Sequence, residues 1–330
     1  MTKQEIMEVF RMPRALYERE IMSPAFELLK ERKGGVSASA MLGYSNICKN
    51  QCLYCGMRAG NKLPLRYRYK PQEIMGLVSQ AYDLGLRRMF LISGEDPLYP
   101  FEDILEVVSK TRAMGFEHVS LAAGEFSRSQ YQELKSAGLT EYAMKFEMSH
   151  RESFERLNPS TSFERRNQAI EDIKAAGLRL GSGNIIDYPG QSLEELADDI
   201  LLMEELQIDW APNIPYMPAS GTPLSVQSDG SPSPRGRIDY LHREISLIRL
   251  LLPDSDITAQ QPGENPAEGL SGVSGNSMAI SAGANLLFVD MLPAAMANNF
   301  HVIDNRIVEG VSHVKSIAQG LNLELKFKDI

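Results

Sequence analysis

The chain has 330 residues, of which 43% are hydrophobic, and its formal net charge is −9. This length allows one large α/β barrel or two average domains, and the acidic balance argues against a protein that tracks nucleic-acid phosphates along a basic stripe. No apolar run reaches the roughly 18 residues of a membrane span, and the N-terminus is charged from its start. We therefore expect a cytoplasmic protein that binds neither nucleic acid nor membrane.

Short apolar or β-branched runs alternate with longer amphipathic segments along the chain. Residues 1–35 are predicted to form an N-terminal helical extension. Eight strands are predicted after it, at 36–44, 88–93, 118–122, 141–147, 179–186, 210–217, 256–259 and 284–290. Helices are predicted between these strands, at 71–84, 101–114, 127–137, 163–176, 192–206, 237–252 and 267–281. A glycine follows each of four of these helices, where a left-handed residue is expected: Gly85, Gly115, Gly138 and Gly177.

The alternation predicts parallel strands joined by crossover helices. A doubly wound sheet also fits, but eight units favour a (β/α)8 TIM-like barrel over residues 36–330, ending in a C-terminal tail. In a barrel the chemistry gathers at the C-terminal ends of the strands. The polar motifs of this chain do follow predicted strands: the cysteines follow the first, residues 94–97 the second, 124–125 the third, Glu147 the fourth and 187–190 the fifth.

The three cysteines of the chain, Cys48, Cys52 and Cys55, lie within eight residues. Such a group in a cytosolic protein favours a metal site over disulfides. A structural zinc site wants four ligands, and this chain has neither a fourth cysteine nor a histidine near the motif. Three thiolates can instead hold three irons of a cubane and leave the fourth iron open. Three inert buried cysteines are the alternative. The basic run that follows, residues 66–70, is predicted to be a solvated loop.

The CxxxCxxC spacing, with the aromatic Tyr54 before the last cysteine, resembles the signature of radical S-adenosyl-L-methionine (SAM) enzymes. The resemblance implies a [4Fe-4S] cluster on Cys48, Cys52 and Cys55, with SAM chelating the open iron. It also implies that Tyr54 lies against the SAM adenine.

Further SAM contacts follow from the same resemblance. The backbone of Gly94 and Glu95 would bind the methionine amino group, and Glu147 would accept the ribose hydroxyls. Arg166 would bind the SAM carboxylate, which a guanidinium fork matches bidentately. We also expect Ile186 to contact SAM.

Within the superfamily, the resemblance is to the biotin synthase-like branch and spans roughly residues 36 to 290. It is closest to the HydE-type maturases of [FeFe]-hydrogenase, and next to methylornithine synthase. The stretches that carry it include 45–56, 93–97 (SGEDP), 124–125, 162–166, 181–191, 222–224 and 252–255. Because no cysteine remains for a second cluster, ordinary biotin synthase is excluded, and the C-terminal cluster of some HydE proteins is absent.

Two departures from HydE concern the substrate side. Gln260 and Gln261 stand after the seventh strand where HydE has two threonines, and Lys145 replaces an arginine. We expect these three residues to face the lumen and contact substrate, together with Asp96 and Tyr216. The alternative for the two glutamines is that they cap the seventh strand and point at the surface.

The resemblance implies an enzyme that reductively cleaves SAM to a 5′-deoxyadenosyl radical. It would act on a small amino-acid-derived or iron-bound cysteine substrate, as a HydE-like enzyme, with reduced flavodoxin or ferredoxin as electron donor. The alternatives are a methylornithine synthase-like amino acid mutase and an unassigned HydE-like subgroup. A non-catalytic iron–sulfur electron carrier is a third, but it would usually ligate its cluster with four residues.

Overall fold

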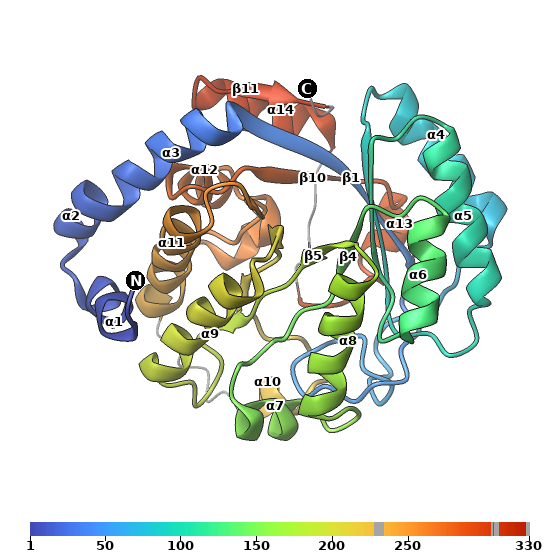
Figure 1. Cartoon of the computed structure of the whole chain (residues 1–330), viewed down its shortest axis with the longest axis horizontal. Helices are drawn as coiled ribbons and strands as arrows, with labels where there is room; N and C mark the ends of the chain where they lie inside the picture. Colours follow the sequence, from blue (N-terminus) through green and yellow to red (C-terminus); the bar gives the residue numbers. More distant parts are fainter. Residues whose placement is uncertain (228–233, 305, 307–309, 328–330) are drawn as a thin grey trace.

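The computed structural model describes residues 1–227, 234–304, 306 and 310–327. Its main sheet is parallel and curls around a central axis (Figure 1). The strands follow in the spatial order β10 (Leu286–Asp290), β1 (Gly35–Ser45), β2 (Arg88–Ser93), β3 (His118–Ala122), β4 (Glu141–Ala143), β5 (Arg179–Gly181), β7 (Trp210–Ala211) and β9 (Asp256–Ile257). Thr258 forms a parallel bridge with Leu286, and the Ala259 amide donates to the Leu286 carbonyl at 2.7 Å. These contacts join β9 to β10, so the predicted eight-stranded barrel is confirmed.

A helix after each strand returns the chain to the other end of the barrel. In chain order these helices are α4 (Pro71–Asp83), α5 (Phe101–Ala113), α6 (Arg128–Ser136), α8 (Phe163–Ala175), α9 (Leu193–Leu206), α11 (Pro234–Leu251), α12 (Val273–Ser281) and α14 (Val311–Gly320). The four predicted helix-ending glycines have φ values of 90°, 103°, 103° and 74°. Because side chains disfavour this left-handed region, glycine ends these helices at little energetic cost.

Several predicted bounds were wrong. The strands predicted at 179–186 and 210–217 each divide, because β6 (Ile185–Ile186) and β8 (Ile214–Pro215) form a separate two-stranded sheet. The strand predicted at 141–147 ends at Ala143. The helix predicted at 267–281 divides into the 3-10 helix η2 (Pro266–Ser271) and α12, and Gly272 between them is extended, with φ −61° and ψ 122°. The short elements α7 (Arg151–Leu157), α10 (Pro223–Gln227), α13 (Ala294–Ala297) and β11 (Glu324–Lys326) were not predicted.

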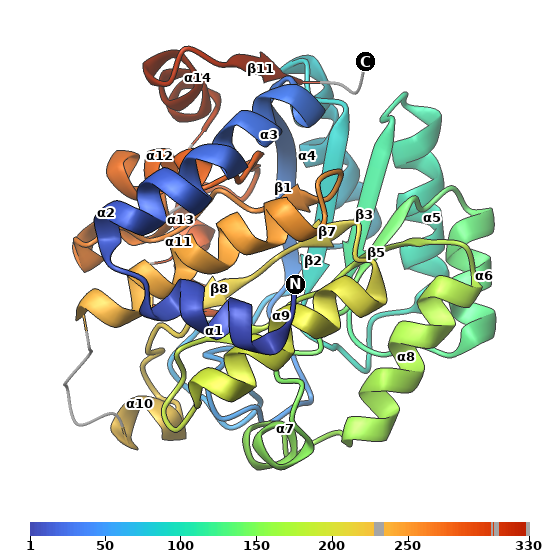
Figure 2. The same ribbon diagram turned by 60° about the vertical axis from the view of Figure 1, so that its left-hand side comes forward.

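Four helices precede the barrel: α1 (Lys3–Arg11), α2 (Arg14–Tyr17), the π-helix η1 (Glu18–Met22) and α3 (Ser23–Lys33). They lie along the outside of the barrel, where α1 packs on α9 and α3 packs on α11 (Figure 2). At the other end of the chain, β11 pairs with the start of β1, so that Gly35 lies opposite Glu324. None of the helices in the described ranges is long and apolar enough to cross a membrane.

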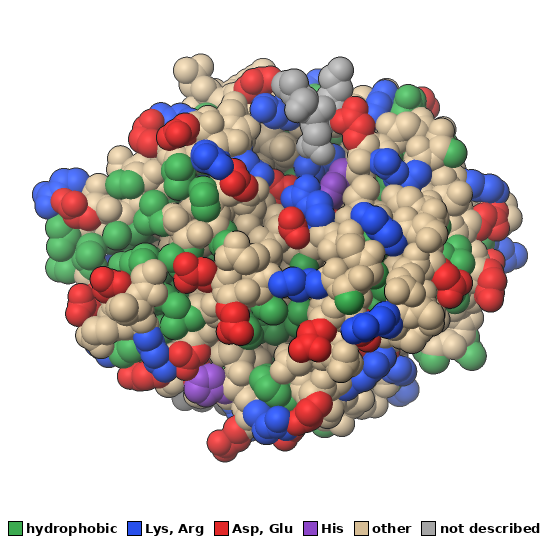
Figure 3. All heavy atoms as spheres, viewed as in Figure 1, with side chains coloured by type: hydrophobic (Ala, Val, Ile, Leu, Met, Phe, Trp, Pro, Cys, Tyr) green, Lys and Arg blue, Asp and Glu red, His purple; other side chains and the backbone are tan. Residues whose placement is uncertain are grey.

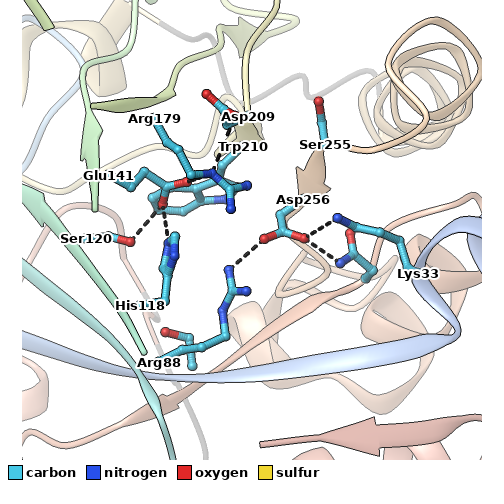
Figure 4. Close-up of polar contacts among 12 residues, drawn as sticks. Lys33, Arg88, His118, Ser120, Glu141, Arg179, Asp209, Trp210, Ser255 and Asp256 are labelled. Atoms are coloured by element: carbon cyan, nitrogen blue, oxygen red, sulfur yellow. Dashed lines mark hydrogen bonds and ion pairs between the residues drawn. The ribbon is translucent and has the colours of Figure 1, made fainter. Parts of the chain in front are cut away.

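A polar network fills the barrel where its strands begin (Figure 4). Arg88 at the start of β2 binds Asp256 of β9 at 2.6 Å, and Lys33 binds the same carboxylate at 2.8 Å. Since β2 and β9 are not neighbours in the sheet, the Arg88–Asp256 contact crosses the lumen. His118 and Glu141 form a second pair at 3.2 Å. On the face shown in Figure 3, side chains of both charge signs and a histidine gather near the centre.

An aromatic layer lies one step further along the strands. Phe90 of β2 meets the ring of Trp210 of β7 edge-on, with centroids 5.0 Å apart, and Phe288 of β10 lies 5.7 Å from Phe90. All three side chains are buried. A Cβ atom at Gly181 would lie 2.7 Å from the Trp210 ring, so only glycine leaves room for this indole. The aromatic layer therefore separates the polar network from the end of the barrel where the strands terminate.

Candidate active site

The cysteine loop leaves the barrel at the C-terminal end of β1, as predicted. Its three thiols are free and partly buried. Burial is the main cause that raises the pKa of each thiol. The charge of Glu147 and the neighbouring Cys48 add to this effect at Cys52, whose pKa rises to about 12, and Cys52 adds to it at Cys55. Three neighbouring buried thiols are therefore unfavourable as thiolates unless a cation compensates them, and metal coordination supplies that charge.

The end of β2 holds this loop in place. A Cβ atom at Gly94 would lie 2.3 Å from the Ile47 carbonyl oxygen and 2.8 Å from Cys48 Cβ, so the close approach requires glycine. The Lys49 amide donates to the Glu95 carbonyl at 2.9 Å. The Glu95 carboxylate binds Lys49 Nζ at 2.6 Å and accepts from Asn50 Nδ2 at 2.8 Å. The Glu95 side chain thus supports the cysteine loop, and its backbone stays beside Cys48.

Arg66 fastens the far side of the same loop. Its Nη1 donates to the carbonyls of Asn46 and Met57, at 2.6 and 2.8 Å, and its Nη2 donates to those of Arg58 and Asn61, at 2.7 and 2.9 Å. The prediction that residues 66–70 form a merely solvated loop was therefore wrong for Arg66. Burial lowers the pKa of this guanidinium, although Cys48 and Cys55 act in the opposite direction.

Glu147 follows β4 with a φ of 64°, which is rare for a residue with a side chain. Its backbone is held on both sides, because its amide donates to the Gly183 carbonyl and its carbonyl accepts from the Ile185 amide, both at 3.0 Å. Lys145 Nζ lies 3.1 Å from Glu147 Oε2. That contact has the distance of an ion pair without hydrogen-bond geometry, so Oε2 has no hydrogen-bond donor among the described residues. The carboxylate lies close enough to Cys52 and Tyr54 to raise both pKa values beyond the effect of burial.

Arg166 lies in the first turn of α8 and points into the same region. Its Nε donates to Glu125 Oε1 at 2.9 Å, and its Nη1 donates to the Lys145 carbonyl at 2.5 Å. Burial by itself lowers the pKa of Arg166, but the charges of Glu125 and Glu147 outweigh burial and raise it. Tyr54 donates to Asn158 Oδ1 at 2.7 Å and packs against an apolar cluster that includes Met148 and Phe154. Tyr54, Glu147 and Arg166 therefore gather beside the cysteine loop.

Of the expected substrate residues, Lys145 is partly exposed and the two glutamines are buried. Lys145 lies beside Glu147 and is 18% exposed. Gln260 and Gln261 are both buried, so neither amide reaches bulk solvent. Gln260 Oε1 accepts from the Phe288 amide at 2.7 Å, which continues the β9–β10 ladder, and its Nε2 has no partner in the described ranges. Gln261 Nε2 donates to the Asn213 carbonyl at 2.9 Å.

The other expected residues, Asp96, Tyr216 and Ile186, bind or pack against neighbouring residues of the protein. The Asp96 carboxylate is held by Arg68 through contacts of 2.6 and 2.5 Å and by Ser45 Oγ at 3.0 Å, and it is 2% exposed. These bonds leave little room for a direct substrate contact. Tyr216 is buried in the apolar cluster next to Tyr54, and Ile186 is buried in β6. The Ile186 carbonyl accepts from the Tyr216 amide at 2.7 Å.

Several residues of this region had no role predicted from the sequence. Glu125 is the acidic partner of Arg166, and its position after the third strand was the available signal. Asn158, which orients Tyr54, lies outside any predicted element. Arg306 binds Asp290 at 3.0 Å at the end of β10, with both side chains nearly buried. No motif surrounds Arg306, so the sequence offered no signal for it.

The arrangement fits an iron–sulfur cluster with SAM beside it. Across the parts of the chain that the structure describes, no three His, Cys, Asp or Glu side chains converge on a single metal position. A cubane does not require such convergence, because each cysteine binds a different iron. The three thiols, the glycine cradle at Gly94 and the Glu147 oxygen that accepts no hydrogen bond from the described residues match the donor set and the polar groups that these two cofactors need.

Comparisons with known proteins agree with this geometry. Residues 42–203 match the family model described as "Radical SAM superfamily". The [FeFe] hydrogenase maturase subunit HydE of Thermotoga maritima is 31% identical over 93% of this chain and 89% of its own length. The 3-methylornithine synthase of Methanosarcina barkeri is 24% identical over 87% of this chain and 79% of its own length. A crystal structure of methylornithine synthase shares the fold, with a TM-score of 0.80, 22% identity and coverage of 97% and 92% of the two chains. The chain belongs to the radical SAM superfamily and is a radical SAM enzyme.

Proposed function

We propose that Cys48, Cys52 and Cys55 hold one [4Fe-4S] cluster and that SAM binds at its open iron. The observation that carries the proposal is that three buried thiols share one barrel mouth with a carboxylate and a guanidinium. The two cofactors together supply reductive cleavage of SAM to methionine and a 5′-deoxyadenosyl radical.

The residues of the mouth orient SAM in this proposal. Glu147 accepts the two ribose hydroxyls, because its Oε2 lacks a donor and a carboxylate suits two vicinal hydroxyls. Arg166 binds the SAM carboxylate, while Glu125 holds its guanidinium in place. Tyr54 packs against the adenine, with its ring fixed by the bond to Asn158.

The proposed reaction is HydE-like, on a small amino-acid-derived or iron-bound cysteine substrate. The similarity to HydE over nearly the whole chain supports this class. The aromatic layer of Phe90, Trp210 and Phe288 limits the depth of the lumen, which supports a small substrate. Lys145 at the mouth is suited to a substrate carboxylate, and the free Nε2 of Gln260 is suited to a hydrogen-bond acceptor.

Anaerobic reconstitution tests the cofactor assignment. We expect about four irons and four sulfides per chain, the absorbance of a [4Fe-4S] cluster, and release of 5′-deoxyadenosine from SAM under dithionite. Cys52→Ser should lose the cluster and the cleavage, whereas Ser160→Ala, on a hydroxyl that only supports the loop, should keep both. A Cys52→Ser protein with full iron content and SAM cleavage would refute the proposal.

Product analysis separates the two reaction classes. A methylornithine synthase-like mutase, which the similarity to the Methanosarcina barkeri enzyme favours as the second candidate, yields a product isomeric with a free amino acid. A HydE-like enzyme yields no such isomer. Liquid chromatography, which separates isomers of equal mass, followed by mass spectrometry after turnover with mixed amino acids would therefore reveal 3-methylornithine only if the second candidate is correct.

A further inference from the structure

The segment around the cysteines has an unusual charge. Residues 41–72 contain six Lys or Arg residues and no Asp or Glu, whereas the rest of the chain has 28 basic and 43 acidic residues, a net charge of −15. Two of the six are neutralised by acids of the neighbouring loop, since Lys49 pairs with Glu95 and Arg68 with Asp96. The other four, Arg58, Lys62, Arg66 and Lys70, form no ion pair within the described ranges. The cysteine loop is thus a positive region on an acidic protein.

Exposed leucines accompany these cations. Six large hydrophobic side chains are exposed in the described parts of the chain. Leu63 and Leu65, at 66% and 67% exposure, belong to this segment, and Leu98, at 74%, lies in the neighbouring loop after β2. Leu65 and Leu98 are fixed on either side of the end of β1. The Leu65 carbonyl accepts from Asn46, while the Leu98 amide donates to Asp96, which also binds Ser45. We call Lys62, Leu63, Leu65 and Leu98 the cluster-loop surface.

A cavity connects this surface with one of the cysteines. Its volume is about 300 Å³, and its lining includes Cys48, Asn61, Lys62, Pro64 and Arg66. Lys62 is exposed at its rim, and Arg66 holds its wall through four carbonyl contacts. Electron transfer slows steeply with distance, and this cavity gives a donor an approach to Cys48.

We propose that the cluster-loop surface is the docking site of an acidic one-electron carrier protein. This inference rests on the proposed function, since it requires a cluster at Cys48. The carrier is oxidised by one electron and the cluster is reduced by one electron, with no bond formed between the proteins. Positive charge steers an acidic partner and raises its association rate. The exposed leucines supply the apolar contact that a protein partner needs and that a small reductant does not use.

The test compares two electron sources on the reconstituted protein. The variants are Lys62→Glu and the double variant Leu63→Asp/Leu65→Asp, which change exposed side chains that have no role in the proposed cofactor site. Anaerobic stopped-flow absorbance measures cluster reduction by a reduced acidic flavodoxin and, separately, by dithionite. At low ionic strength we expect each variant to lower the second-order rate constant with flavodoxin about tenfold. The rate with dithionite should stay within about twofold.

Two matched controls and a binding assay complete the design. Lys135→Glu on α6 and Leu84→Asp after α4 place the same changes at exposed positions away from the cysteine loop and should leave both rates unchanged. Calorimetry with oxidised flavodoxin and the cluster-free protein should show weaker binding for the cluster-loop variants alone. Unchanged flavodoxin rates and affinity, or equal losses in the controls, would overturn the inference. Equal losses with dithionite would place the defect in the cluster, and an unaltered parent that binds no iron would refute the proposed function itself.

Discussion

Replacing Arg166 with alanine should weaken both the fold and SAM binding. Arg166 donates to Glu125 at 2.9 Å and to the Lys145 carbonyl at 2.5 Å, and its side chain is 11% exposed. Hydrogen bonds to charged groups contribute about 1.5–3 kcal/mol each, and removing one partner of a buried ion pair destabilises by about 3–5 kcal/mol. We therefore expect the free energy of unfolding of the cluster-free protein to fall by about 3 kcal/mol in urea denaturation.

The effect on SAM is a separate measurement. Loss of a buried charge-assisted contact weakens binding by about 2–5 kcal/mol, and 3 kcal/mol corresponds to about a 150-fold higher Kd. Calorimetry on the reconstituted protein should show this loss with unchanged iron content. Arg166→Lys should recover part of it, because the charge stays and the fork is lost. Arg165→Ala, on the 43% exposed neighbour, should change Kd little. If Arg166→Ala lowered stability but left Kd within about threefold, Arg166 would only hold Glu125, and the assignment to SAM would be wrong.

Three further predictions concern buried polar groups. Asp256→Asn should lower the free energy of unfolding by about 3 kcal/mol at pH 7 in urea denaturation. Burial favours the neutral acid, but Arg88 and Lys33 outweigh it and depress the pKa of Asp256. The contribution of Asp256 to stability is therefore present above pH about 4 and is lost as pH falls, and the variant should lack this acid-dependent loss. Burial raises the pKa of Glu244 to about 8. As pH rises from 5 to 8, the free energy of unfolding of the parent should therefore fall by up to about 1.4 kcal/mol per pH unit, and Glu244→Gln should flatten this fall. Gln260→Thr should lower the free energy of unfolding by about 1–3 kcal/mol, because a buried amide loses its acceptor, while SAM cleavage under dithionite persists.

The fold could be predicted largely from local signals. Helices such as α4 and α5 end at glycines, and an apolar run precedes each helix. This alternation of apolar runs and helices indicates parallel strands. The bounds of the later strands could not be predicted, because the apolar runs at 179–186 and 210–217 continue past the end of regular pairing. The contribution of Gln260 to the β9–β10 closure could not be predicted, since its side chain accepts from the Phe288 amide in addition to the backbone contacts of Thr258 and Ala259.

Some residues of the candidate site are indicated by the sequence, and others are not. The cysteines, Gly94 and Glu147 each follow a predicted strand, which indicated one end of the barrel, whereas their cofactor roles were implied by the family resemblance and stay predictions. Asp96 lies in the same motif, but its carboxylate is occupied by Arg68, which stands 28 residues earlier in a loop. Spacing along the sequence does not indicate such an ion pair, because the conformation of the loop determines which distant side chain contacts the carboxylate. The support of the site by Asn158 and Arg306 depends on loops in the same way.

The layers of the lumen suggest why relatives of similar fold act on different molecules. The network of Arg88 and Asp256 joins strands across the barrel, so changes there act on stability. The ring of Trp210 fits only because residue 181 is glycine, which couples the aromatic layer to the backbone of β5. Among the described residues, Lys145 at the open mouth has no such cross-barrel ion pair: its ammonium lies 3.1 Å from the carboxylate of Glu147. We expect a substitution of Lys145 to cost the fold little, whereas Gly94 and Arg66, which fasten the cysteine loop, tolerate little change.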